Sequence, residues 1–580
     1  MDSVCPERLL HVERVDDLPV LFACLDRLGV AKLLDRQFKN HEHHFWKGQL
    51  TFGEVVSVWL AFLLSQGDHR LYRLEGWAKE HQRTLQALLG KPVRALDFHD
   101  DRLADVLDCL PQEESWQALE ADLNGQAVRV YDLETSLIRI DTTTANSYAS
   151  VLPEHGLIQF GHSKDRDDLP QLKVAVAALD PLGMPLTAAA LPGNGADDPV
   201  YVPEIRKVQV AFGPGGKTYV VDCKGTALAT RAYLASTGDY YLGPLSLTVV
   251  SREQRLLLLE PVWQGKQALQ EVRRPGAAPG AAGELVARGF SFDVALEAKV
   301  EGKLVQWTER RWLVQSLALA KSQQQHLDRR LQQAQEQLEQ LGQRKQGKKR
   351  LTAEQMQAAA DEILRKQRVE GLLTAAVQTT TRRRRLRRYG DRPEQVLLEQ
   401  EQRMELWRDE AAIERAKREM GWQVYASNQL TLPLAGVVWA YRGQYRIEDD
   451  WSRLKGRPLS LTPLFLSSER RMQGLVLLLS IALRVLTLLE WVVRRKLLQG
   501  EEKLKGLYPG QAGRQTDRPS AELLLRAFQG INLIVEVVAG QVRRLLTPLN
   551  ALQNKLLALW DFPSDLYARL ELHFAEPPPH

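Results

Sequence analysis

The chain has 580 residues, of which 44% are hydrophobic and 26% are charged, and its formal net charge is +5. This length is sufficient for about three or four domains and for a large buried core. The composition is that of an ordinary globular protein, which excludes a largely disordered chain, and the mildly basic charge does not by itself define a partner.

The cysteines and the most apolar segment indicate a cytoplasmic protein. The chain has four cysteines, Cys5, Cys24, Cys109 and Cys223. They form no CxxC pair and no zinc pattern with histidine, so we expect reduced thiols. No signal peptide opens the chain. The run GLVLLLSIALRVLTLLEWVV, from Gly474, is long enough to span a membrane, but Arg484 and Glu490 interrupt it. A buried core helix is therefore favoured, with no membrane partner.

Residues 1–130 are expected to form an α-helical domain. The segments LPVLFACLDRLGVAKLLDRQF and FGEVVSVWLAFLLSQ carry apolar residues at three- and four-residue steps, as helices with one buried face do. Between them, His41, His43 and His44 lie in the segment HEHHFW. No cysteine or pair of acids lies nearby at ligand spacing, so a polar loop is favoured there over a metal site.

Residues 131–245 change to a pattern of strands and helices. The apolar runs LIRID, KVAVAALD and LTAAALP are followed by DDPVYVPEIRKVQVAF, KTYVVD, TALATRAYLASTG and DYYLGPLS. The link DPLGMP contains Asp-Pro and Gly, which favour a hairpin between the second and third runs. The expected order is β-β-β-α-β-α-β, an α/β fold with a mixed sheet, which is the arrangement of ribonuclease H.

Two acids in this region, Asp197 and Asp198, precede Pro199 in the motif ADDP. Asp before Pro at the start of a helix is typical of an N-cap, so capping is favoured over catalysis for this pair.

Residues 246–428 interrupt the strand pattern with an expected insertion domain. After the turn-rich segment PGAAPGAAGE, a 4-3 step predicts a helix with about four heptads. Its positions are Leu313, Leu317, Ala320, Leu327, Leu331, Ala334, Leu338 and Leu341. A second helix is expected over 352–375, which would complete an antiparallel hairpin. This hairpin could pack on itself or contact DNA or a partner. QVLLEQEQRMELW and GWQVYASN alternate like strands.

Two basic clusters without acids lie in the same segment. The first contains Arg344, Lys345, Lys348, Lys349 and Arg350, and the second contains Arg382, Arg383, Arg384, Arg385, Arg387 and Arg388. Such runs form solvated loops or contact phosphates, and both interpretations remain open here.

The core pattern resumes in residues 429–500. AGVVWAYRGQYRIEDDWSRLK has helical spacing, and the long apolar helix follows it from Gln473. Residues 501–580 are expected to form a C-terminal helical region that contains AELLLRAFQGI and ALQNKLLALW.

Three acids from these segments have the chemistry of a divalent-metal site. Asp141 ends the first expected strand, and Asp222 ends the fourth. In a mixed sheet of the expected order these strands are neighbours, so their ends should meet. Glu448 lies on the helix that follows the insertion. Carboxylates are the ligands that Mg²⁺ and Mn²⁺ prefer, and two such ions can activate water and stabilise a leaving oxygen in phosphodiester hydrolysis.

The helix of Glu448 carries further polar side chains at helical steps. Tyr441, Gln444, Glu448 and Lys455 are separated by three, four and seven residues, which predicts that they share one helical face. An aromatic hydroxyl and an ammonium beside a carboxylate suit a metal site that a phosphate approaches.

The chain resembles the DDE transposases of bacterial insertion sequences, in particular the cut-and-paste group with a Tyr-x2-Arg-x3-Glu-x6-Lys signature. Tyr441, Glu448 and Lys455 match that spacing, but Gln444 stands at the arginine position. The blocks IDTTTAN, FGHSKDRDDLPQLK, GNGADDPVY and VVDCKG also resemble this family. The resemblance covers roughly residues 10–560.

This resemblance implies a ribonuclease H-like core interrupted by an insertion domain, and an N-terminal domain that binds transposon ends. It implies two Mg²⁺ or Mn²⁺ ions per site, held by Asp141, Asp222 and Glu448. Tyr441 and Lys455 would contact phosphate. Lys164, in GHSKD, would either contact target DNA or serve the turn, and the two basic clusters are candidate DNA contacts. In some relatives an aromatic residue of the insertion stabilises a flipped base, and Trp407 and Trp422 are candidates for this role, with core packing as the alternative. The partner is double-stranded DNA, bound by a homodimer in the bacterial cytoplasm at the nucleoid.

The expected function is transposition: binding of terminal inverted repeats, metal-dependent cleavage at the element ends, and joining of the 3′ ends to target DNA. Two alternatives remain. One is a catalytically inactive DNA-binding relative, and the other is a metal-dependent nuclease without strand transfer.

Overall fold

A nine-stranded mixed sheet runs through the middle of the molecule in the order β4-β3-β2-β5-β6-β12-β9-β8-β7. The strands are β2 (Leu137–Asn146), β3 (Gln171–Leu179), β4 (Met184–Pro192), β5 (Thr218–Val220), β6 (Tyr240–Pro244), β7 (Gln270–Arg273), β8 (Leu285–Val300), β9 (Lys303–Ser316) and β12 (Trp422–Ser427). β5 is parallel to β2 and β6, and the remaining pairs are antiparallel.

This computed structural model describes the chain except for residues 1–7, 39–49, 149–155, 164–165, 167, 275–282, 343–350, 387–394, 512, 539–540 and 572–580. Of the expected site residues, Lys164, all five members of the first basic cluster, Arg387 and Arg388 lie outside the described residues, as do the three histidines of HEHHFW.

The order β-β-β-α-β-α-β expected for residues 131–245 is confirmed. β2, β3 and β4 form an antiparallel meander, and α8 (Tyr201–Phe212) and α9 (Leu228–Thr237) follow β4 and β5, respectively. The DPLGMP segment joins β3 to β4, as its turn residues predict. β2 and β5 are neighbours, so the two strands expected to carry Asp141 and Asp222 do lie side by side.

The sheet continues into the segment expected to be a separate insertion. β12 pairs with both β6 and β9, and β9 pairs with β8 over the full length of β9. Arg231 of α9 and Tyr241 of β6 both bond the buried carboxylate of Glu309 on β9. The predicted boundary between 245 and 246 therefore does not coincide with an edge of the sheet.

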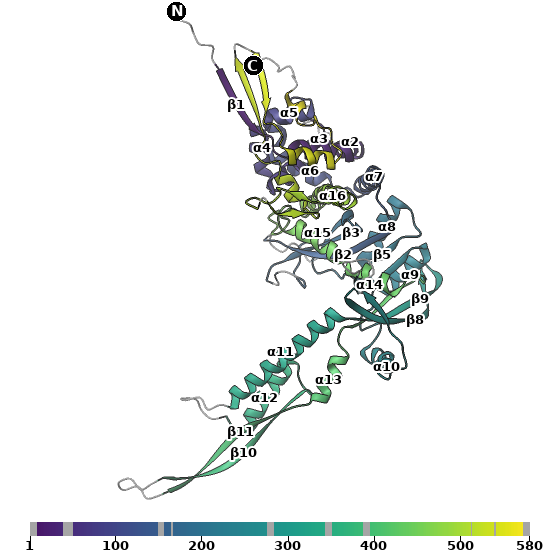
Figure 1. The fold of residues 1–580 in the computed structure, drawn as a ribbon, viewed down its shortest axis with the longest axis vertical. Helices are drawn as coiled ribbons and strands as arrows, with labels where there is room; N and C mark the ends of the chain where they lie inside the picture. Colours follow the sequence, from purple (N-terminus) through teal and green to yellow (C-terminus); the bar gives the residue numbers. More distant parts are fainter. Residues whose placement is uncertain are drawn as a thin grey trace, which may run out of the picture.

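An elongated arm leaves this sheet between β9 and β12 and points away from the rest of the molecule (Figure 1). It consists of α11 (Leu317–Gly342), α12 (Ala353–Gln367), β10 (Leu373–Leu386), β11 (Gln395–Arg408) and α13 (Glu410–Arg418). Ser316 N–H donates to the carbonyl of Gly421 at 2.9 Å, so the two ends of the arm start from one point.

The heptad positions of α11 pack within the arm. Leu327, Leu331, Ala334 and Leu338 are buried in a cluster with Ala360 and Leu364 of α12, and with Leu373 and Ala375 of β10. The self-packing interpretation is thus confirmed for the described residues.

Two details of the predicted arm are wrong. Leu313 lies on β9 rather than on α11. The second helix ends at Gln367, not at 375, because Arg368 adopts a left-handed conformation and caps it, and β10 begins at Leu373. The strands predicted from QVLLEQEQRMELW and GWQVYASN are confirmed as β11 and β12.

The opposite end of the molecule is mainly helical, as expected for residues 1–130. Its helices are α1 (Leu18–Leu28), α2 (Val30–Gln37), α3 (Phe52–Gln66), α4 (Leu71–Glu80), α5 (Gln82–Leu89), η2 (Ala95–Phe98), α6 (Asp100–Cys109) and α7 (Glu113–Tyr131). However, Arg8–Arg14 forms a strand, β1, which pairs with β15 (Asn532–Val538). This pairing joins residues from opposite ends of the chain, so no local pattern could indicate it.

The C-terminal region is not wholly helical, and the prediction for 501–580 is corrected. α17 (Ala521–Arg526) and α18 (Ala551–Leu559) form where AELLLRAFQGI and ALQNKLLALW are. Between them, β15 pairs with β16 (Gln541–Leu546), and β13 (Leu504–Lys505) pairs with β14 (Gln515–Thr516). A 3-10 turn, η4 (Ala568–Glu571), follows α18.

The long apolar helix, α16 (Glu469–Gln499), lies in the core between the N-terminal helices and the sheet (Figure 1). It is long and apolar enough to cross a membrane, but 94% of its most apolar window is buried inside the protein. Its two interrupting charges are paired: Arg484 donates to the Leu186 carbonyl at 2.8 Å, and Glu490 accepts from Arg453 and Arg494. The core-helix interpretation is confirmed.

The helical segment that carries Glu448 is broken. It forms α14 (Leu434–Arg442) and α15 (Tyr445–Lys455), joined at Gly443 through backbone bonds of the tighter three-residue type. A Cβ on Gly443 would lie 2.3 Å from the guanidinium of Arg139. Tyr441 therefore belongs to a different helix from Glu448 and Lys455, and the prediction of one continuous helical face is wrong.

Candidate metal and DNA site

Asp141 lies on β2, and Asp222 follows the end of the neighbouring parallel strand β5. The register pairs Ile138 with Tyr219 and Arg139 with Val220. Two residues further along each chain come Asp141 and Asp222. β5 stops at Val220, whereas β2 continues to Asn146 against β3. Asp222 thus follows the end of its strand as predicted, but Asp141 lies within β2 and not at its end.

The Asp222 carboxylate is held by its own turn and by α8. Its Oδ1 accepts the hydroxyl of Tyr201 at 2.5 Å and the backbone N–H groups of Lys224 and Gly225, both at 2.9 Å. A Cβ on Gly225 would lie 2.6 Å from the Tyr201 ring, so the glycine of VVDCKG permits this close approach. All three donors use Oδ1, so Oδ2 takes part in none of these bonds.

Trp451 connects Asp141 to the helix of Glu448. Its indole Nε1 donates to Asp141 Oδ2 at 3.1 Å. Trp451 follows Glu448 by three residues on α15, so the two side chains leave neighbouring positions on the surface of that helix. Glu448 and Asp449 are exposed, whereas Asp450 is buried, and burial raises the Asp450 pKa well above its usual range. Of these consecutive acids, Asp450 is therefore unsuited to binding a cation from solution.

The pKa values of two buried tyrosines are affected by the acids, that of Tyr441 by all three and that of Tyr201 by Asp222 and Asp141. Burial, followed by the charges of Asp222, Cys223, Asp141 and Glu448, raises the pKa of Tyr441 to about 12. The pKa of Tyr201 is also raised, by burial and then by Asp222, with smaller contributions from Asp141 and Asp197. The acids from β2, β5 and α15 therefore act on the same region, which favours binding of a cation there.

Gln444 stands where the signature has an arginine, and Arg139 of the neighbouring strand β2 already places a guanidinium beside it. Gln444 Oε1 accepts from Arg139 Nη1 at 3.4 Å, and Arg139 also donates to the Ala440 carbonyl and to Asp180. Arg446 bonds the same Asp180 carboxylate. Arg139 is 2% exposed, so it orders the α14–α15 junction and cannot contact DNA. An arginine at 444 would add a third guanidinium to this half-buried cluster.

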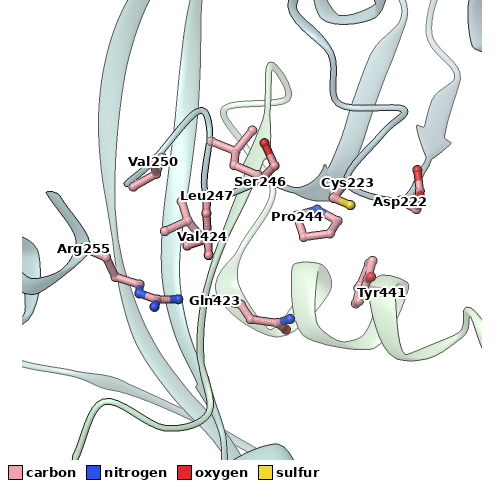
Figure 2. A pocket seen from close by; sticks show the side chains of 11 residues that line it. Asp222, Cys223, Pro244, Ser246, Leu247, Val250, Arg255, Gln423, Val424 and Tyr441 are labelled. Carbon is pink, nitrogen blue, oxygen red and sulfur yellow. The ribbon is translucent and has the colours of Figure 1, made fainter. Parts of the chain in front are cut away.

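A pocket of about 460 Å³ opens beside Asp222. Asp222, Cys223 and Tyr441 lie at one end of it, and Val250, Val424 and Arg255 lie further from Asp222 (Figure 2). Arg255 comes from α10 (Arg252–Trp263). The pocket therefore combines carboxylate, apolar and cationic walls, which suits a group with an apolar face and a negative charge.

Asp141, Asp222 and Glu448 do not form a closed metal cage in this structure. Among the residues that the structure describes, only His99, Asp100 and Asp101 bring three ligand atoms within 4.8 Å of one another. Asp141, Asp222 and Glu448 do not meet that criterion.

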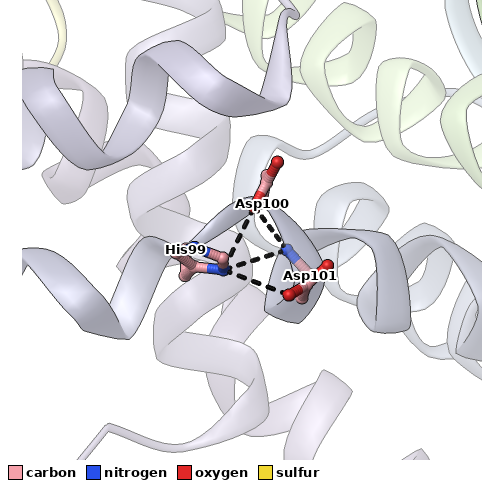
Figure 3. A group of neighbouring side chains, drawn as sticks. All are labelled: His99, Asp100 and Asp101. Carbon is pink, nitrogen blue, oxygen red and sulfur yellow. Dashed lines mark hydrogen bonds and ion pairs between the residues drawn. The ribbon is translucent and has the colours of Figure 1, made fainter.

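The cluster of His99, Asp100 and Asp101 has a simpler explanation (Figure 3). All three residues are exposed at the start of α6, and His99 Nδ1 lies 3.1 Å from Asp100 and 3.5 Å from Asp101. His99 also accepts from the Asp101 N–H as a helix cap. These contacts are those of a helix terminus, and the motif was not singled out from the sequence.

The ADDP acids do not cap the helix that follows them. Asp197 makes no capping bond. It accepts instead from Lys173 Nζ of β3 at 2.7 Å and from Thr142 of β2 at 3.4 Å. The capping prediction for Asp197 is therefore wrong, because a lysine on an adjacent strand supplies a stronger donor than the helix N-terminus. Asp198 is exposed.

The remaining expected residues are dispersed. Lys455, half-buried, is the last residue of α15. Arg382, Arg383, Arg384 and Arg385 lie on β10, far along the arm from the acids (Figure 1). Trp422 is 4% exposed and donates to the Arg418 carbonyl, so it is a packing residue rather than a base-flipping one. Trp407 is 50% exposed on β11.

Sequence reasoning missed two residues that position the acids, namely Tyr201 and Trp451. Tyr201 is the last residue of the block GNGADDPVY, and Trp451 stands three residues after Glu448. The three-residue spacing between Glu448 and Trp451 could have indicated Trp451 from the sequence. No local spacing linked Tyr201 to Asp222, because their contact joins the start of α8 to the end of β5.

Comparisons with known proteins cover the chain unevenly. A domain of unknown function, DUF4277, matches residues 10–121, which include most of the N-terminal helices. No curated protein matches the chain. One solved structure with similarity is a cryo-EM structure of a piggyBac transposase synaptic complex with hairpin DNA. It shares 8% identity over 89% of this chain and 79% of that chain, with a TM-score of 0.34. Similarity this low does not support a conclusion about activity.

Proposed function

We propose that the protein is a transposase that cleaves DNA at the ends of its element and joins the freed 3′ ends to target DNA. The observation that supports this most directly is the parallel pairing of β2 with β5, whose last paired residues, Arg139 and Val220, each stand two positions before an acid of the proposed site. The proposal treats residues 131–245 and 429–500 as a ribonuclease H-like core of bacterial insertion-sequence type.

In this proposal Asp141, Asp222 and Glu448 hold two divalent ions, Mg²⁺ or Mn²⁺. The ions supply activation of water and stabilisation of the leaving 3′ oxygen. Tyr201 and Trp451 hold the carboxylates of Asp222 and Asp141 in fixed orientations through single hydrogen bonds. Such supporting bonds commonly change metal affinity or activity by about 10- to 100-fold.

Two other side chains would contact the scissile phosphate or its neighbours. Tyr441 keeps its proton at neutral pH, since its pKa is about 12, so its hydroxyl can donate to a phosphate oxygen. Lys455 ends α15 and would contribute positive charge. Joining two ends to one target implies a homodimer on double-stranded DNA, acting in the bacterial cytoplasm at the nucleoid.

The test is cleavage and joining of duplex DNA that carries the element's own ends. Purified protein is incubated with Mg²⁺, Mn²⁺ or EDTA, beside the Glu448→Gln variant. We expect metal-dependent cleavage at the end and transfer to a supercoiled target, both lost in the variant. Cleavage without joined product would identify a nuclease. Tight binding without cleavage in either metal would identify an inactive DNA-binding relative.

A further inference from the structure

The outer half of the β10–β11 ribbon extends beyond the helices that support its base. At the base, Gln357 of α12 donates to the Ala375 carbonyl at 3.0 Å and accepts from the Val377 N–H at 3.2 Å. Leu373 and Ala375 are buried in the arm cluster. From Thr379 onward, the described side chains of β10 are exposed. The described hydrogen bonds from α12 therefore reach β10 only at its base, at Ala375 and Val377.

The strand register places the acidic residues of the ribbon on one of its two faces, whereas both faces carry arginines. β10 and β11 are antiparallel, with Arg383 opposite Leu398 and Arg385 opposite Val396. Directly opposed residues share a face, and alternate residues belong to the other face. We call the face with Arg383 and Arg385 the basic face. Its outer members are Thr379, Thr381, Arg383, Arg385, Val396, Leu398, Gln400 and Gln402.

All the acids of the ribbon fall on the other face. Glu399, Glu401 and Glu405 occupy odd positions of β11, and Glu399 stands opposite Arg382. Within β10 and β11, the basic face contains no acidic residue. A surface that contacts only solvent would not require the acids to lie on one face, since mixed charges on both faces would give the same solubility.

The basic face also exposes aliphatic side chains that solubility does not explain. Val396 is 58% exposed and Leu398 is 63% exposed, and they are separated by one residue on the same face. Exposed aliphatic residues on a two-stranded ribbon favour unwanted pairing unless a partner covers them. The arginines opposite them require that this partner be strongly negative, and the absence of acids removes repulsion from it.

We propose that the basic face of the outer ribbon binds the major groove of duplex DNA. The groove is about 12 Å wide and admits a two-stranded ribbon. β10 has 14 residues, so it spans roughly 45 Å, which lets the outer half reach well beyond α12. Arg383 and Arg385 contact phosphates and guanine edges, while Val396 and Leu398 contact thymine methyl groups. The inference rests on the proposed action on DNA.

The matched variants for the test are Arg383→Gln/Arg385→Gln on the basic face and Arg382→Gln/Arg384→Gln on the other face. Both remove two positive charges from the same strand. Affinity for a fluorescein-labelled duplex of mixed sequence is measured by anisotropy over a range of salt concentrations, in the full-length protein. We expect the basic-face variant to reduce the slope of log affinity against log salt by about 2, since each phosphate contact contributes about 0.9. The other variant should leave the slope unchanged.

Groove choice is read from methylation interference with the same duplex. Methylation of guanine N7, which lies in the major groove, should weaken binding of the wild-type protein but not of the basic-face variant. Equal losses from the two variants, or no loss from either, would overturn the face assignment. Interference only at minor-groove positions would overturn the groove assignment.

Failure of the inference and failure of the proposed function are distinguishable. The same measurements are repeated with Glu448→Gln, which leaves the arm intact. One outcome is that the two arm variants differ in DNA binding while the wild type shows no metal-dependent cleavage. In that case the transposase proposal is wrong and the inference that the arm binds DNA is retained. If cleavage is found and the two arm variants bind alike, the inference about the arm fails.

Discussion

The strands that carry Asp141 and Asp222 and the strands of the arm differ in what surrounds them. In β2 every residue except Leu137 and Asp141 is buried, so packing on both faces fixes the geometry of the acids. The outer part of β10 and β11 is exposed on the described side chains, and only alternation decides which residues meet a partner. We therefore expect DNA cleavage to depend on the rigid sheet and DNA affinity to depend on the arm. Variants in the two regions should change these two properties separately.

The largest expected effect tests the sheet. Asp141→Asn should lower metal-dependent cleavage by about a thousandfold or more, since it removes a carboxylate that no neighbour replaces. Binding of duplex DNA should remain. Asp198→Asn is the matched control, because Asp198 is an exposed acid near the site, and it should retain cleavage. A loss of cleavage in both variants to the same extent would show that general negative charge, not Asp141 itself, matters.

A second prediction compares buried leucines in the two regions. Leu478 on α16 and Leu331 on α11 are 0% and 2% exposed, and Leu→Ala at such positions costs about 2–5 kcal/mol. Leu478→Ala should lower the midpoint of the main unfolding transition. Leu331→Ala should instead increase hydrogen exchange in α11, α12 and β10 and weaken DNA binding. If Leu331→Ala lowers the main midpoint as much as Leu478→Ala, the arm does not unfold separately.

A third prediction concerns pH and the compact end of the molecule. Burial raises the pKa of Asp17 from 3.8 to about 7. Because the folded-state pKa exceeds the unfolded one, this contribution to stability is complete below pH 3.8 and is lost as the pH rises through 7. The free energy of unfolding should therefore fall by up to about 4 kcal/mol across this interval, at 1.36 kcal/mol per pKa unit. Asp17→Asn should remove that part of the decrease, as measured by denaturation at several pH values.

The control for this prediction is the arm, which holds no buried acid among the described residues. Hydrogen exchange in β10 and β11, corrected for the intrinsic pH dependence of the chemistry, should not follow the Asp17 titration. A parallel change in the arm would show that the two regions are coupled.

The smallest expected effect is that of a positioning residue. Tyr201→Phe removes the hydroxyl that bonds Asp222 Oδ1 but keeps the ring that packs beside Gly225. We expect a 10- to 100-fold loss of cleavage, of the order found for residues that orient ligands. A higher Mg²⁺ concentration should recover part of it, and DNA affinity should stay unchanged. If added Mg²⁺ has no effect, Tyr201 acts on packing rather than on metal binding.

Much of the arrangement around the acids could be predicted from local patterns. Alternating and continuous apolar runs predicted β2, β3 and β4 and the α8–β5–α9–β6 succession, since burial of one or both faces leaves a period in the sequence. The neighbouring positions of the Asp141 and Asp222 strands followed from that order. The exact site of Asp141 did not, because β5 ends at Val220 while β2 continues, and strand length depends on the partner.

Local patterns were enough to predict the order of strands and helices in residues 131–245, the burial of α16 and the amphipathic seam of α11, because each leaves a local period of apolar residues. Three other features became apparent in the folded protein alone. Arg139 interrupts the helix at Gly443, β1 pairs with β15 across the length of the chain, and β7, β8, β9 and β12 extend the sheet through the expected insertion. Each depends on contacts between residues far apart in sequence, and such contacts leave no local signal.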